Sequence, residues 1–155
     1  MKDFDPEIAE AVFEFMDSEE WKYDFDEEMG LIKLSLSTNS KLQSYRIYLS
    51  LRSDGLSMLL TMPVKATKDV RSKMAEFITR ANYGMYIGGF EMDCGDGEIR
   101  FRSSLISPDF VPTIKSLQML FYTSVNTVDH YADALASVLF GFAEPEEAIR
   151  LADEK

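Results

Sequence analysis

The apolar residues of the first segment recur every three or four positions, which predicts one face of an amphipathic helix. Asp5 is a suitable N-terminal cap, and Pro6 fits the first helical position. Glu7, Glu10 and Glu14 fall on the opposite, solvent-facing side. The apolar positions of this expected helix are Phe4, Ile8, Val12, Phe15 and Met16.

Four segments then alternate between apolar and polar residues, which is typical of strands with one buried face. They are Trp21–Asp26, Ile32–Ser37, Tyr45–Arg52 and Leu56–Met62. Short polar connections such as Asp54-Gly55 can join only antiparallel neighbours. We therefore expect a four-stranded antiparallel meander.

Helical spacing returns after Pro63, with Thr67 as the expected cap and Gly84 as the stop. Two further strands are expected at about Met85–Met92 and Glu98–Leu105, joined by a turn rich in Asp and Gly. Gly88-Gly89 inside the first of them predicts a bulge or the close approach of another element.

A long helix is expected after Pro108 or Pro112, with an apolar seam running from Ile114 to Phe142. Asn126-Thr127 is a candidate kink, and a short last helix is expected over Glu146–Asp153. The predicted order is α-β-β-β-β-α-β-β-α-α. Helices separated from antiparallel strands in this way predict one two-layer α+β domain over residues 1–155, an antiparallel sheet packed against helices.

Charge is distributed unevenly along the 155 residues. The chain has 16 basic and 27 acidic residues, a net charge of −11, and residues 1–28 hold 12 of the acids and two of the lysines. The stretch from Lys33 to Arg80 is net basic. An overall negative charge repels polyanions, so we expect no nucleic-acid partner. A single cysteine and the lack of a long apolar run favour a cytoplasmic protein without a membrane partner.

Residues that could carry chemistry are sparse. His130 is the single histidine and lies within the long expected helix, where the neighbouring Asp129 is poorly placed to orient its ring. Cys94 lies among acids, which oppose thiolate formation. The acidic turn around Gly95 lacks the residues of a calcium loop. We expect no catalytic residue, metal site or cofactor, and therefore no enzyme.

The outward side of the expected meander is a more promising feature. It carries Arg46, Tyr48, Arg52 and Leu59, beside Lys33. Tyr and Arg are enriched at protein interfaces, and a one-sided antiparallel sheet leaves its second face available. The simpler interpretation is a solvated strand face, because single exposed apolar residues are normal. Arg46, Tyr48, Arg52 and Leu59 are therefore candidate partner-binding residues.

The chain resembles the YbjN-like family of bacterial proteins, in which a helix ends with an Asn and an acidic Asp-Gly turn leads into an Arg-bearing strand. The segments that carry the resemblance are Phe77–Tyr83, Gly89–Asp93 and Asp96–Arg102, followed by Val128–Tyr131, Gly141 and Glu144–Ala148. The strand expected at Trp21–Asp26 is an addition to the family's usual three.

The resemblance implies a sensory transduction regulator with a fold similar to that of type III secretion chaperones. Those chaperones are small acidic dimers that bind extended segments of client proteins without catalysis or cofactor. We therefore expect a non-enzymatic protein-binding regulator or chaperone-like adaptor in bacterial signalling or stress response, acting as a homodimer. The alternative is a small-ligand sensor with a pocket between helix and sheet, near Gly88-Gly89 and Tyr86.

Overall fold

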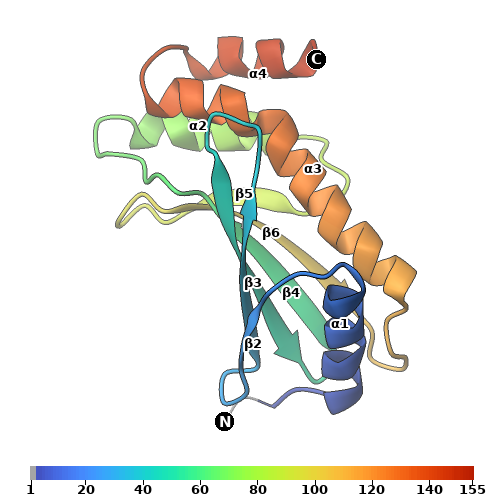
Figure 1. Cartoon of the computed structure of the whole chain (residues 1–155). Coiled ribbons are helices and arrows are strands. Elements are labelled where there is room, and N and C mark those ends of the chain that lie inside the picture. Colours follow the sequence, from blue (N-terminus) through green and yellow to red (C-terminus); the bar gives the residue numbers. More distant parts are fainter. Residues whose placement is uncertain (1–2) are drawn as a thin grey trace.

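A computed structural model describes residues 3–155, which form one six-stranded antiparallel sheet and four helices (Figure 1). The order of elements is the one predicted from the sequence. The elements are α1 (Pro6–Ser18), β1 (Asp24–Asp26), β2 (Leu31–Ser37), β3 (Ser44–Arg52), β4 (Gly55–Thr61), α2 (Arg71–Asn82), β5 (Gly89–Met92), β6 (Ile99–Ile106), α3 (Ile114–Leu139) and α4 (Pro145–Asp153).

The strands lie side by side in the order β1-β2-β3-β4-β6-β5, and every neighbouring pair is antiparallel. The meander from β1 to β4 is therefore confirmed. In its register Lys33 pairs with Tyr48, and Tyr48 pairs with Leu59. The β5–β6 hairpin joins the meander through β6, which pairs with β4, so residues distant in sequence share one sheet face.

The helices pack over one side of the sheet (Figure 1). α1 packs against α3, α3 lies on β6, and α2 lies beside β5. α4 packs on α2 and α3, outside this first helical layer. The result is a mainly two-layer α+β arrangement with a short outer helix.

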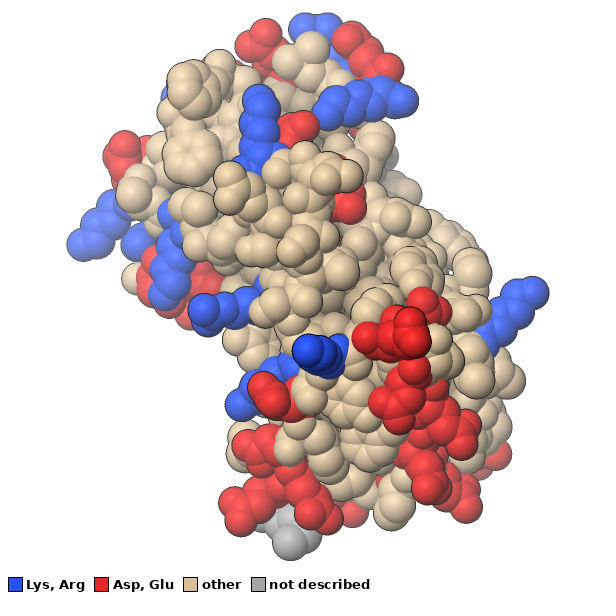
Figure 2. Space-filling model, in the orientation of Figure 1, with Lys and Arg blue, Asp and Glu red and all other residues tan. Residues whose placement is uncertain are grey.

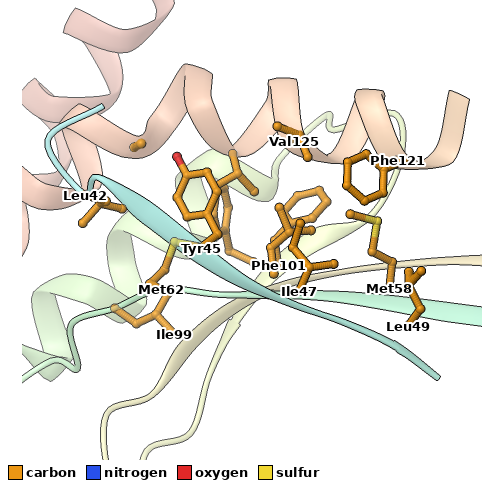
Figure 3. Packing of buried hydrophobic residues seen from close by; sticks show 14 of the residues in the cluster. Leu42, Tyr45, Ile47, Leu49, Met58, Met62, Ile99, Phe101, Phe121 and Val125 are labelled. Atoms are coloured by element: carbon orange, nitrogen blue, oxygen red, sulfur yellow. The ribbon is translucent and has the colours of Figure 1, made fainter. Parts of the chain in front are cut away.

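The core lies between α3 and the inward side chains of the strands (Figure 3). Ile47, Met58 and Phe101 are fully buried below α3, which contributes Phe121 and Val125. The period-two alternation placed these inward residues correctly. Each fully buried side chain of this size stabilises the fold by roughly 1.5–3 kcal/mol.

Two helix starts differ in how well the sequence predicted them. Asp5 caps α1 as expected, and its carboxylate accepts hydrogen bonds from the backbone N–H groups of Glu7 and Ile8. The prediction that Thr67 caps α2 is wrong, because the helix begins at Arg71. The Thr67 hydroxyl donates to Asp69 instead, and its carbonyl accepts from Val70 within a preceding turn.

Two predicted strands are shorter than expected. The segment Trp21–Asp26 forms a strand only over Asp24–Asp26, because Trp21 turns inward and packs on Phe121 with ring centroids 4.4 Å apart. The segment Met85–Met92 is a strand only from Gly89, because Gly88 takes a positive φ of 71°. A Cβ at Gly88 would lie 2.5 Å from the Arg102 carbonyl, so the predicted close approach is confirmed.

The long helix α3 begins after Pro112, with the Thr113 hydroxyl accepting from the backbone of Ser116. It continues through Asn126-Thr127 as one 26-residue helix. The predicted seam is wrong at its two ends, because Ile114 and Phe142 are exposed. Ile114 is the first residue of α3, and Phe142 lies beyond its last residue, Leu139.

Candidate protein-interaction face

The outward side of the sheet carries a group of basic, aromatic and apolar side chains that are partly or fully exposed. They come from four neighbouring strands, β2, β3, β4 and β6. We call this surface the open sheet face and define it as Lys33, Arg46, Tyr48, Leu59, Thr61, Arg100 and Arg102.

Three of the four predicted binding residues come together on this face. Tyr48 on β3 pairs directly with Leu59 on β4, and Arg46 is the next outward residue along β3. Arg52 lies at the far end of β3, opposite Gly55, and lines neither of the hollows described next. The structure therefore groups Arg46, Tyr48 and Leu59 and leaves Arg52 apart.

Two shallow hollows meet at Arg46 and Tyr48. One, of about 460 Å³, extends over β4 and β6 and includes Leu59, Lys65 and Arg100 in its lining. The other, of about 360 Å³, extends over β2 and the start of β1, and its lining includes Lys22 and Lys33. Arg46 can therefore contact a ligand in either hollow.

A charged cluster on β5 and β6 lies at one side of the open sheet face. Glu91 accepts hydrogen bonds through Oε1 from both Arg100 and Arg102, with an Arg102 Nη2 distance of 3.0 Å. Partial burial raises the pKa of Glu91, but the hydrogen bonds from Arg102 and Arg100 outweigh it and leave that pKa below its usual value. Glu91 therefore neutralises part of the positive charge of β6.

Arg100 and Arg102 were missing from the predicted binding residues. The alternation around Phe101 already indicates that both point outward. The missing information was the strand order, because only the pairing of β6 with β4 places them beside Leu59 and Thr61.

His130 lies exposed on α3, with its ring edge-on to Tyr131. Its sequence neighbour Asp129 points elsewhere and accepts hydrogen bonds from the hydroxyls of Tyr45, at 2.6 Å, and Thr38, at 2.7 Å. Burial and the hydrogen bond to Asp129 raise the pKa of Tyr45 to about 12. Asp129 therefore ties β3 to α3 and does not orient the histidine.

The turn between β5 and β6 places Cys94 on the surface. Its acids hold the turn itself, since Asp93 accepts from the backbone of Gly95 and Asp96 accepts from that of Glu98. Within residues 3–155, no group of three or more His, Cys, Asp or Glu residues is placed to hold a metal ion.

A groove between α3 and β6 lies near the predicted ligand pocket. It has a volume of about 420 Å³ and is lined mainly by apolar side chains, including Ile87, Leu105 and Met119. Tyr86 is 95% exposed and is not part of the lining. The structure thus has a groove between helix and sheet, and Ile87, the residue between Tyr86 and Gly88, is part of its lining.

None of the helices in the described part of the chain is long and apolar enough to cross a membrane. Acidic side chains gather over the lower end of the molecule in Figure 2, where α1 lies, and Lys and Arg lie mainly above it. The end of the molecule at α1 is therefore acidic, whereas basic and acidic side chains are interspersed over the rest of this view.

Comparison with known proteins identifies the family. Residues 9–137 match the model of the YbjN family, described as "Putative bacterial sensory transduction regulator". The chain also resembles the crystal structure of YbjN from E. coli, described as "a putative transcription regulator", with a TM-score of 0.58 and 10% identity, over 78% of this chain and 85% of that one. No curated protein matches the sequence. The family model spans most of the sequence, and the fold of this chain is similar to that of the solved YbjN structure. The chain therefore belongs to the YbjN family of bacterial regulators.

Proposed function

We propose that this protein is a non-enzymatic regulator that works by binding another protein through the open sheet face. The observation that carries this proposal is the grouping of Arg46, Tyr48 and Leu59 around two adjoining hollows. Tyr and Arg dominate the energetics of many interfaces, and an apolar neighbour such as Leu59 adds buried area. The family's description as a regulator agrees with a binding role.

The absence of a converging catalytic group among the described residues supports the same proposal. Asp129 is engaged by Tyr45 and Thr38, and His130 has no carboxylate hydrogen bond in residues 3–155. General acid–base or nucleophilic chemistry needs such groups within hydrogen-bond reach.

A capture experiment from a lysate of the source bacterium tests the proposal. The bait is compared with a Tyr48→Ala/Leu59→Thr variant, and with Phe142→Ser, which alters an exposed aromatic residue beyond the end of α3. We expect one saturable partner that wild type and Phe142→Ser retain and the double variant loses. Equal capture by all three baits would contradict binding through this face.

We propose further that the protein acts as a homodimer in the cytoplasm, in a chaperone-like manner. Exposed apolar side chains near the end of β6, at Ile106, Phe110 and Val111, support a contact between copies. Light scattering at tens of micromolar should report a dimer, and a monomer at that concentration would contradict it.

The groove at Ile87, Leu105 and Met119 favours small-ligand sensing as a second candidate function. An apolar concave site of this size is typical of ligand pockets. A thermal-shift screen separates the two candidates, because a ligand at 100 times its Kd adds about 2.7 kcal/mol of stability. A hit whose effect disappears in Met119→Glu would favour the sensor.

A further inference from the structure

Positive charge on the open sheet face is distributed unevenly between paired and unpaired groups. At the β6 side, Arg100 and Arg102 share Glu91, and Lys65 has Asp96 as a salt-bridge partner at 2.7 Å. At the β2 side, Lys22, Lys33 and Arg46 have no salt bridge to any described residue. The unpaired cations thus surround the hollow that Tyr23 and Tyr48 also line.

These unpaired cations lie on a chain with a net charge of −11. Residues 1–28 hold 12 of the acids, yet Asp24 is the single acid in the lining of this hollow. Exposed cations on a protein of opposite net charge form a local patch whose field attracts anionic groups. A guanidinium without a protein acceptor, such as that of Arg46, can also bind a carboxylate through two hydrogen bonds.

We infer that the partner contributes an extended, acidic segment that lies across the strands of the open sheet face, with its carboxylates on Lys22, Lys33 and Arg46. This inference rests on the proposed function and names the chemistry of the partner. The two hollows share Arg46 and Tyr48, so one segment can occupy both. The row of paired residues Lys33, Tyr48, Leu59 and Arg102 spans roughly 15 Å, or three interstrand spacings.

About four or five extended residues cover that distance. Carboxylates at the β2 end meet the unpaired cations, and an apolar side chain beyond them meets Tyr48 and Leu59. A long nucleic acid fits less well, because it extends beyond three cations onto a molecule of strongly negative charge.

Fluorescence anisotropy with a short labelled peptide of alternating Glu and Tyr residues tests the inference. A peptide with Gln at every Glu position and a short DNA duplex serve as parallel probes. We expect the Glu peptide to bind, the other two probes to bind at least about tenfold more weakly, and added salt to weaken the binding.

The matched variants are Arg46→Glu and Arg52→Glu, which reverse charge on the same strand and the same side of the sheet. We expect Arg46→Glu to weaken peptide binding by at least about tenfold, the effect of losing one charge-assisted hydrogen-bonded pair. Arg52→Glu should change it by less than about twofold. Neither the Arg46 nor the Arg52 side chain makes a salt bridge in the described structure, so both variants should retain wild-type thermal unfolding.

Four results would overturn the inference. Equal binding of the Glu and Gln peptides would show that charge is not recognised, and tighter binding of DNA through Arg46 would assign the patch to a polyanion. Self-association that Arg46→Glu abolishes would assign the patch to a second copy. If no peptide binds but the captured partner still depends on Tyr48 and Leu59, the inference fails and the proposed function stands.

Discussion

Phe101 and Arg102 are consecutive residues of β6 in opposite environments, and they represent the two faces of the sheet. Phe101 is fully buried and packs edge-on against Phe90, with ring centroids 5.2 Å apart. Arg102 points to the open sheet face, where it forms a salt bridge with Glu91. The helix-covered face therefore supplies most of the stability, whereas the ion pairs of the open face lie near solvent and stabilise little.

The largest expected difference between the faces is in stability. Phe101→Ala should lower the free energy of unfolding by about 3–5 kcal/mol, because it removes buried area and leaves a cavity. Arg102→Ala should lower it by less than about 1 kcal/mol, since an exposed ion pair contributes little. Urea unfolding of both variants measures the contrast. If Phe101→Ala is too unstable to purify, Ile47→Val should still cost about 0.5–1.5 kcal/mol, and similar losses on both faces would contradict the comparison.

Much of this contrast could be predicted from the sequence because alternation is a local property. The inward residues Ile47, Met58 and Phe101 and the outward residues Arg46, Tyr48 and Leu59 follow from period two alone. The turn at Asp54-Gly55 is also a local signal, and it fixes which residues of β3 and β4 pair.

The rest depended on contacts between distant segments. The pairing of β6 with β4 brings Arg100 to Thr61, and no local pattern encodes that pairing. Trp21 fitted a strand by spacing, but its packing on Phe121 removed it from the ladder. Arg52, like Arg46, is an arginine on β3. The two differ only in the shape of the surface around them, because Arg46 lines both hollows and Arg52 lines neither.

A pH titration probes one long-range polar link from the covered face to α3, the hydrogen bond from Tyr45 to Asp129. Tyr45, with its pKa near 12, holds its proton in the folded state up to higher pH than the usual value of 10 allows. The folded state thus binds more protons between these values, so stability is intact below about pH 10 and falls as pH rises toward 12. We expect Tyr45 to account for a loss on the order of 1–2 kcal/mol, less than the full shift implies because Asp129, which accepts its hydrogen bond, is exposed and solvent screens the interaction.

The difference between wild type and Tyr45→Phe isolates this contribution, since the other tyrosines are common to both proteins. Chemical denaturation at several pH values between 9 and 12 measures it. A wild-type curve that falls no more steeply than that of Tyr45→Phe would show that the Tyr45–Asp129 hydrogen bond does not persist in solution.

A small expected change in stability on the open sheet face sharpens the comparison most. Leu59→Thr keeps a residue suited to a strand while removing apolar surface from the lining of the larger hollow. Because Leu59 lies outside the core, the free energy of unfolding should change by less than about 1 kcal/mol, as is usual for surface substitutions. The Tyr48→Ala/Leu59→Thr variant should nevertheless lose the captured partner. A loss of several kcal/mol for Leu59→Thr alone would mean that this face is structural, and that its partly exposed tyrosine and its arginines stabilise the fold instead of binding a partner.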